Sequence, residues 1–221
     1  MKNESFNFKY FETRAQPRNQ SARELQYSFE KKRISAFFRN GKILDYGAGL
    51  GEFTQLFLDS SNEVYVYDIS EYARFQLNKK GFNVIQDLDT CKSSFDLVLL
   101  RGVLQHLPDP FNQLIYIRSL LKSGGLLVLL ATPNCRSVSF LITGTNPSLS
   151  PSLSYLYPTD VNIINFLQAN GFRLLKKYYP YWKSPYRSFI KDNLRFMFSI
   201  IGFKKSYPYY RNMMELYFEK L

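Results

Sequence analysis

Three glycines at alternate positions follow an acid and form the most chemically specific pattern in the chain. Residues 43–51 read ILDYGAGLG, so a short apolar run reaches Asp45 and then Gly47, Gly49 and Gly51. Glycine permits backbone angles and close approaches that a side chain would forbid, and the N-terminus of a helix offers unpaired N–H groups to an electron-rich ligand. Apolar residues at helical spacing follow at 53–58. We therefore expect a strand, a tight ligand-binding turn and a helix.

Two other nucleotide-binding motifs fit this stretch less well. A phosphate-binding loop needs Gly-x-x-x-x-Gly-Lys-Ser/Thr, and no lysine or hydroxyl residue follows Gly51 at that spacing. A dinucleotide fingerprint needs Gly-x-Gly-x-x-Gly, and its last position, counted from Gly47, falls on Glu52. The pattern that remains is Asp-x-Gly-x-Gly-x-Gly. Taken alone, it leaves open a glycine-rich turn in some other α/β protein.

A second acid stands at the end of the next predicted strand. Residues 63–67, EVYVY, are followed by Asp68, which lies 17 residues beyond Gly51. In a β-α-β unit the second strand lies beside the first, and an acid at its end can accept hydrogen bonds from both hydroxyls of a ribose. Asp68 can also cap the helix predicted after it, and the two roles are compatible.

The Asp-x-Gly-x-Gly-x-Gly pattern at residues 45–51 resembles motif I of the class I S-adenosylmethionine-dependent methyltransferases. Two later segments resemble the same family, FDLV at 95–98 with VLQHLPDP at 103–110, and LKSGG at 121–125 before an apolar run. The resemblance covers about residues 43–134. It implies an α/β fold with a doubly wound, Rossmann-like sheet of seven mostly parallel strands, which binds S-adenosylmethionine at the end of the first strand.

The resemblance also implies which residues contact this cofactor. Asp87 and Leu88 would meet the adenine, although Asp89 is close enough to take the same role. Tyr10 and Arg14 would reach the methionine end, or they would only pack on the core. The implied cofactor residues are Tyr10, Arg14, Asp45, Gly47, Ala48, Gly49, Gly51, Asp68, Ile69, Asp87, Leu88, Arg101 and Gly102.

His106, the only histidine, is expected on the acceptor side of the site. It can serve as general base for a hydroxyl acceptor, or it can order its loop by hydrogen bonds. The segment LRGV at 100–103 lacks the Asn/Asp-Pro-Pro-Tyr/Phe pattern of the family's exocyclic-amine nucleic-acid enzymes. The Pro-Cys nucleophile of the family's cytosine C5 enzymes is missing, since neither Cys91 nor Cys135 follows a proline. The paired glutamates of the arginine methyltransferases are also missing. What remains resembles quinone O-methyltransferases and the methyltransferases of bacterial surface-polysaccharide biosynthesis.

We therefore expect transfer of a methyl group to a small-molecule or glycan acceptor, a sugar nucleotide or a lipid-linked saccharide, at a hydroxyl or amine. A quinone-like lipophilic O-methyltransferase is the alternative enzyme. From another functional class, the chain would be a non-catalytic module that binds S-adenosylmethionine or RNA.

The net charge of +11 suits nucleic acid, an anionic membrane surface or a phosphate-bearing substrate. The basic residues are scattered in pairs and triplets without a long tract, so we expect an ordinary solvated surface and no nucleic-acid partner. No apolar run approaches the ~20 residues of a membrane span and no signal-peptide core is present, which favours the cytoplasm. Cys91 and Cys135 are isolated, so neither a disulfide framework nor a metal site is indicated.

Residues 1–40 are expected to form an N-terminal helical cap, with a helix over about 21–39 that ends near Asn40-Gly41. Residues 41–221 would form the cofactor-binding domain. Within it, 184–203 predicts an amphipathic lid helix, which would pack on the core, pair with another subunit or contact a membrane surface. The tail at 213–220 is interpreted as a closing strand, with a short helix as the alternative. Nothing in the sequence indicates an oligomeric state.

Overall fold

The computed structural model describes residues 10–11, 20–59, 61–202 and 207–221. The strands are β1 (Gly41–Tyr46), β2 (Asn62–Tyr67), β3 (Asn83–Val84), β4 (Phe95–Arg101), β5 (Leu121–Pro133), β6 (Phe172–Tyr178) and β7 (Met213–Lys220). The α-helices are α2 (Gln20–Ile34), α3 (Glu71–Lys79), α4 (Pro110–Leu120), α5 (Val138–Thr143), α6 (Asp160–Ala169) and α7 (Phe189–Ile200). Four 3-10 turns are η2 (Thr54–Phe57), η3 (Leu88–Cys91), η4 (Leu104–His106) and η5 (Pro180–Lys183).

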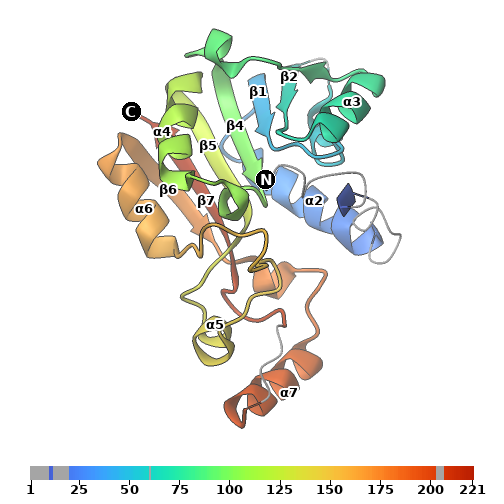
Figure 1. The fold of residues 1–221 in the computed structure, drawn as a ribbon, viewed down its shortest axis with the longest axis vertical. Helices are drawn as coiled ribbons and strands as arrows, with labels where there is room; N and C mark the ends of the chain where they lie inside the picture. The colour runs from blue at the N-terminus through green and yellow to red at the C-terminus, as the bar shows by residue number, and fades with distance from the viewer. Residues whose placement is uncertain (1–9, 12–19, 60, 203–206) are drawn as a thin grey trace.

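The strands form one seven-stranded sheet in the order β3-β2-β1-β4-β5-β7-β6 (Figure 1). Strands β1 to β5 run parallel to one another, and β7 pairs antiparallel with both β5 and β6. The predicted doubly wound, mostly parallel fold is confirmed. The tail forms a strand, as expected, and not the alternative helix.

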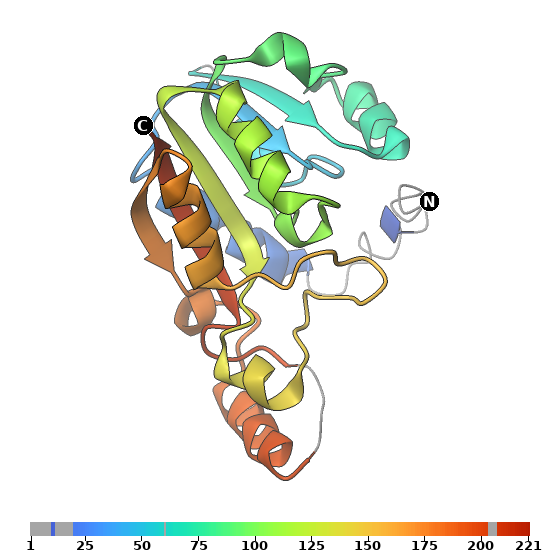
Figure 2. The ribbon, with the colours of Figure 1, turned by 60° about the vertical axis from the view of Figure 1, so that its left-hand side comes forward.

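The central strands are buried on both faces, which explains their continuous apolar runs. In β4, Val98 and Leu100 pack in a core shared with α4 and α6. The alternate residues Leu97 and Leu99 pack in a second core together with Tyr27 of α2. Figure 2 shows α4 and α6 in front of the sheet and α2 behind it. Among the residues that the structure describes, no helix has the length and apolar content needed to cross a membrane.

The helix expected over 53–58 is replaced by the single 3-10 turn η2. The Asp59 carboxylate accepts hydrogen bonds from the Ser61 N–H (3.0 Å) and from the Asn62 side chain (2.9 Å). Such a local side-chain turn competes with helix formation, so the chain leaves η2 at once and enters β2. The ligand-binding turn therefore does not open onto an α-helix N-terminus.

Other elements differ in their limits from the sequence-based expectation. Helix α2 ends at Ile34 and not near Arg39. Apolar and aromatic residues at 172–182 predict a strand, but β6 ends at Tyr178, because Pro180 has no N–H for a ladder and starts η5. The proline- and serine-rich segment 131–158 predicts a long loop, but β5 continues to Pro133 and the rest of the segment contains α5. The amphipathic helix lies between β6 and β7 in the chain, as predicted, but covers only 189–200.

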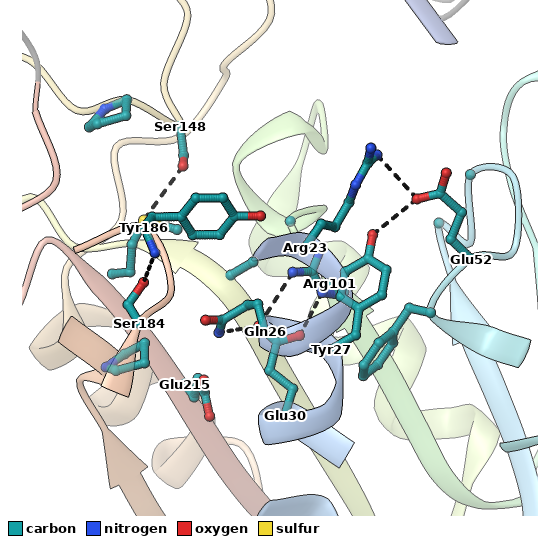
Figure 3. A pocket seen from close by; sticks show the side chains of 18 of the residues that line it. Arg23, Gln26, Tyr27, Glu30, Glu52, Arg101, Ser148, Ser184, Tyr186 and Glu215 are labelled. Carbon is teal, nitrogen blue, oxygen red and sulfur yellow. Dashed lines mark hydrogen bonds and ion pairs between the residues drawn. The ribbon is translucent and has the colours of Figure 1, made fainter. Parts of the chain in front are cut away.

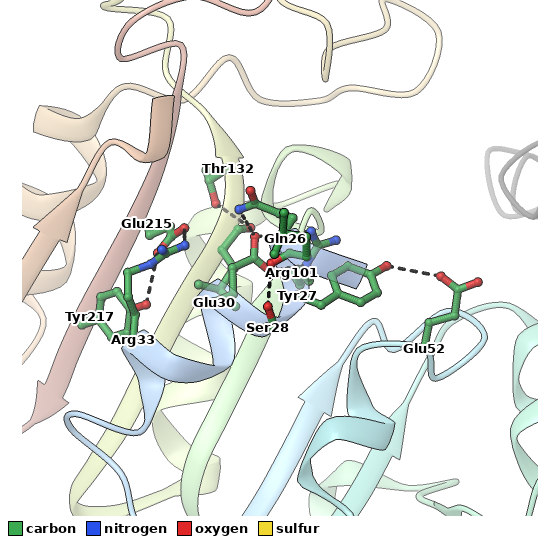
Figure 4. A network of polar contacts seen from close by, with 12 residues as sticks. Gln26, Tyr27, Ser28, Glu30, Arg33, Glu52, Arg101, Thr132, Glu215 and Tyr217 are labelled. Carbon is green, nitrogen blue, oxygen red and sulfur yellow. Dashed lines mark hydrogen bonds and ion pairs between the residues drawn. The ribbon is translucent and has the colours of Figure 1, made fainter. Parts of the chain in front are cut away.

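Two buried ion pairs fix α2 to the sheet (Figure 4). The Arg101 Nε of β4 lies 2.6 Å from Glu30 Oε2. One turn further along α2, Arg33 binds Glu215 of β7 with both guanidinium branches, at 2.6 and 2.5 Å. Glu30 and Glu215 are almost fully buried. Burial raises the pKa of the Glu215 carboxyl, and the hydrogen bond from Arg33 opposes that shift.

We expect Arg33→Met to lower the free energy of unfolding by about 3–5 kcal/mol, because it leaves the Glu215 charge buried without a partner. Urea denaturation near neutral pH measures this loss. The double variant Arg33→Met/Glu215→Leu removes both charges and should recover much of the stability. If the single variant is no less stable than the double variant, the pair does not stabilise the fold in this way.

Candidate active site

The turn between β1 and η2 is tied to the end of β2. The N–H groups of Gly47 and Ala48 donate to the Tyr67 carbonyl, at 2.7 and 3.1 Å. The Gly49 N–H donates to Asp68 Oδ2 at 2.9 Å. These bonds place the predicted turn and the predicted ribose-binding acid side by side. They also mean that the amides of Gly47, Ala48 and Gly49 are engaged within the protein.

The three glycines of the turn all have a backbone conformation that favours glycine. Gly47, Gly49 and Gly51 have φ of +82°, +58° and +79°, in the left-handed region that side chains rarely adopt. Among the described residues, a Cβ on Gly49 would meet only Phe11, at 3.6 Å. A Cβ on Gly51 would lie 2.7 Å from the Phe82 ring. Gly51 lines neither of the two cavities described below, and its positive φ together with its packing against Phe82 and Leu77 of α3 accounts for it.

One cavity of about 500 Å³ lies beyond the carboxyl ends of β1, β2 and β4, and we name it the β2 cavity. The predicted residues that line it are Tyr10, Gly47, Gly49, Asp68, Ile69, Asp87, Leu88, Arg101, Gly102 and His106. Sequence reasoning missed several of its other residues, namely Tyr46, Tyr67, Gln113, Tyr116 and Tyr155. Tyr46 and Tyr67 end their strands directly before Gly47 and Asp68, so their positions were a usable signal.

Asp68 is buried in the wall of the β2 cavity. Burial raises its pKa, and hydrogen bonds from the N–H groups of Ser70 and Gly49 act in the opposite direction. Each carboxylate oxygen accepts one of these bonds and keeps capacity for another donor. The cap of α3 is Ser70, whose hydroxyl accepts from the Ala73 N–H, so the alternative role of Asp68 as helix cap is wrong.

Of the two acids considered for the adenine contact, only Asp87 lines the β2 cavity. Its carboxylate accepts from the Asp89 N–H at 2.9 Å and caps η3. Asp89 instead accepts from the Tyr116 hydroxyl at 3.0 Å.

A second cavity of about 470 Å³ lies between α2, the turn after β1 and the segments that flank α7, and we name it the α2 cavity (Figure 3). Of the predicted residues, Asp45 and Ala48 line only this cavity. Its other polar and aromatic residues include Arg23, Gln26, Tyr27, Glu30, Gln105, Ser148, Tyr181, Ser184, Tyr186, Asn212 and Glu215. The two cavities share Phe11, Gly47, Gly49, Arg101, Gly102 and His106. Arg14 lies outside the described residues.

Asp45 is buried and Arg101 is partly buried in the lining of the α2 cavity. The Thr54 hydroxyl donates to Asp45 Oδ2 at 2.6 Å. Burial raises the pKa of Asp45 to about 6, against the lowering effects of this bond and of the Arg101 charge. Arg101 binds Glu30 and lies 4.3 Å from the centre of the Tyr27 ring, so it holds α2 in place.

His106 lies in η4 and lines both cavities. Its Nδ1 is 2.9 Å from the Leu153 carbonyl oxygen. A carbonyl only accepts, so Nδ1 carries the proton and Nε2 of the neutral ring keeps its lone pair. Nε2 is 3.3 Å from the Gln105 side-chain nitrogen, which also donates to the Gly102 carbonyl at 3.2 Å. The backbone thus fixes the tautomer that suits a general base.

The chain matches the model of a protein family described as the methyltransferase domain over residues 18–177. It belongs to this family. The predicted class of enzyme is thereby confirmed.

Solved structures of other methyltransferases share the fold of this one. A SAM-dependent methyltransferase from Archaeoglobus fulgidus is 21% identical, with a TM-score of 0.62 and coverage of 90% of this chain and 94% of that chain. The magnesium protoporphyrin IX methyltransferase from Synechocystis PCC 6803, solved with bound SAH, is 17% identical, with a TM-score of 0.60 and coverage of 91% and 84%. At identities of 21% and 17%, the structural likeness to these two proteins supports the fold alone.

The residues of this methyltransferase fit the cofactor that the sequence implied. Asp68 would accept the ribose hydroxyls of S-adenosylmethionine, with Asp87 and Leu88 toward its adenine. Gly49 and His106 both line the two cavities, so a ligand can continue past the turn toward His106.

We expect Asp68→Ala to weaken S-adenosylmethionine binding by about 3 kcal/mol or more, because two charge-assisted hydrogen bonds are lost. Isothermal titration calorimetry measures the difference. Glu63→Ala removes an exposed acid of the same strand outside both cavities and serves as the control. Equal affinity of Asp68→Ala and the wild type would refute the ribose assignment.

Asp45→Asn should stabilise the protein near neutral pH and have little effect near pH 4. Because the folded-state pKa is raised from 3.8 to about 6, the charged carboxylate costs stability that appears as pH rises through this window. Removing that charge is expected to gain at most about 3 kcal/mol at about pH 7. Thermal unfolding of both proteins across this pH range gives the difference, and a pH-independent gap would contradict the assignment.

Proposed function

We propose that this methyltransferase transfers the methyl group of S-adenosylmethionine to a hydroxyl or amine of a small-molecule or glycan acceptor that binds in the α2 cavity. The family match and the sequence motif support S-adenosylmethionine as the cofactor, and a neighbour of the same fold was solved with bound SAH. The glycan would be a sugar nucleotide or a lipid-linked saccharide of surface-polysaccharide biosynthesis.

The observation that carries the choice of acceptor is the lining of the α2 cavity. Amide, hydroxyl and carboxylate side chains from α2, η4 and the segments flanking α7 stand beside Tyr27, Tyr181 and Tyr186. A hydroxyl-rich ring needs such hydrogen-bonding partners together with flat apolar surfaces. The quinone-like alternative would use fewer of these polar groups.

When bound, the cofactor supplies a methyl carbon activated by its neighbouring sulfonium. The protein then has to align a nucleophile and keep water away. A hydroxyl nucleophile must also lose a proton, and His106 lies on the wall common to both cavities. Its Nε2 carries the lone pair of the ring and lies 3.3 Å from the Gln105 amide nitrogen, which the acceptor hydroxyl would replace as donor. The Leu153 carbonyl keeps the opposite ring nitrogen protonated, and it stabilises the imidazolium that forms after proton transfer.

For His106→Ala we expect kcat to fall by about 100-fold or more on a hydroxyl acceptor while S-adenosylmethionine affinity is retained. His106→Asn is the matched control, since its amide can donate to the Leu153 carbonyl but cannot take a proton at neutral pH. If it restores activity to within a few-fold of the wild type, His106 only orders its loop and is not the base.

The function is tested by a screen for S-adenosylhomocysteine release over sugar nucleotides, lipid-linked saccharides, quinone precursors and RNA. Turnover on a saccharide would support the proposal. Turnover only on quinone precursors would establish the lipophilic O-methyltransferase instead. Binding of S-adenosylmethionine without turnover on any class would favour the non-catalytic module, and salt-dependent binding to unrelated oligonucleotides would favour the RNA-binding one.

A further inference from the structure

Helix α7 has an inverted amphipathic arrangement. Its buried residues are Asp192 and Ser199, both polar. The opposite face exposes Ile190 (74%), Met197 (63%) and the following Ile201 (70%). Soluble helices normally turn the apolar stripe toward the core. This stripe is directed away from the protein, so its residues do not serve the packing of the fold.

The polar face is held by specific contacts that fix the rotation of α7. The Asp192 carboxylate accepts from the Ser188 N–H (2.9 Å) and the Tyr181 hydroxyl (3.2 Å). The Ser199 hydroxyl lies 3.2 Å from the Tyr207 hydroxyl. The rings of Phe196 and Tyr209 stack at 4.8 Å. Because these groups anchor one face, the apolar stripe stays on the outside.

The stripe belongs to a wider exposed apolar surface at one end of the molecule. Figures 1 and 2 both place α7 beyond the end of the sheet, beside α5, and the two helices are in contact. Leu141 of α5 is 73% exposed, and Trp182 and Tyr186, shortly before α7, are 56% and 42% exposed. Aromatic residues of this kind favour the boundary between lipid head groups and acyl chains.

The charges around the stripe have one sign. Lys183, Arg187, Lys191 and Arg195 are exposed in and before α7. Between residues 180 and 202 the only acid is Asp192, which is buried. Asp192 pairs with one of these residues, Arg195, at 3.7 Å, so positive charge remains in excess. An apolar stripe, exposed aromatic rings and an excess of basic residues together are the features of a helix that lies in an anionic lipid interface.

We propose that α7, with Trp182 and Tyr186, is a membrane-binding surface that docks on bilayers containing anionic phospholipids. Tyr186 and Ser184 line the α2 cavity, so docking through α7 would bring the wall of the acceptor site close to the lipid surface. This surface goes beyond the proposed function and does not depend on it, although it suits an acceptor that is carried on a lipid.

Cosedimentation with vesicles of phosphatidylcholine, with and without phosphatidylglycerol, tests the proposal. We expect the wild type to bind the vesicles that contain phosphatidylglycerol, and Ile190→Asp/Met197→Asp to bind them at least about tenfold more weakly. Phe75→Asp on α3 is the matched control, since Phe75 is an equally exposed (65%) apolar residue elsewhere and should not affect binding. Lys183→Gln/Lys191→Gln should weaken binding at low salt more than at high salt.

Three results would overturn the proposal: no vesicle binding by the wild type, undiminished binding by Ile190→Asp/Met197→Asp, or self-association of the wild type that this variant abolishes. The last would identify the surface as an interface between copies of the chain. Calorimetry with S-adenosylmethionine on the same variant shows that the fold is intact. It also separates failure at this surface from failure of the proposed methyl transfer.

Discussion

The hydrogen bonds between the glycine turn after β1 and the end of β2 are the contacts on which the site depends. They hold Gly49 against Asp68 and so bring the glycine turn and the buried carboxylate to the same point of the sheet edge. Both cavities meet there, and His106 lies on their common wall. A site that joins a cofactor to an acceptor requires this arrangement, because the two ligands must approach each other at one place.

The second constraint is the attachment of α2. Buried carboxylates are stable only when a cation and hydrogen bonds compensate for lost hydration, and Glu30 and Glu215 each have an arginine partner. These pairs join α2 to β4 and β7, and they build the polar wall of the α2 cavity from residues far apart in the chain. The same contacts thus serve both the fold and the cavity proposed to bind the acceptor.

The sequence predicted the sheet well because strands buried on both faces, such as β4, carry continuous apolar runs whose limits are local. Asp68 and the glycines could be found because their spacing along a β-α-β unit determines their position in space. Gln26, Glu30 and Glu215 could not be found, since tertiary packing alone brings them together. The helix expected over 53–58 does not form, because the Asp59 carboxylate accepts hydrogen bonds from the two residues that lie two and three positions later and closes a turn there. For α7, periodicity predicted an amphipathic helix but not which face would be exposed.

A methyltransferase with a polar acceptor cavity and an outward apolar helix fits a reaction on a polar group held near a lipid surface. The central claim is that the turn and Asp68 form a working cofactor site. Calorimetric titration of the purified chain with S-adenosylmethionine and S-adenosylhomocysteine tests it most directly. The structure predicts micromolar binding of both ligands at a single site. No detectable binding of either would contradict the cofactor assignment and the enzymatic function built on it.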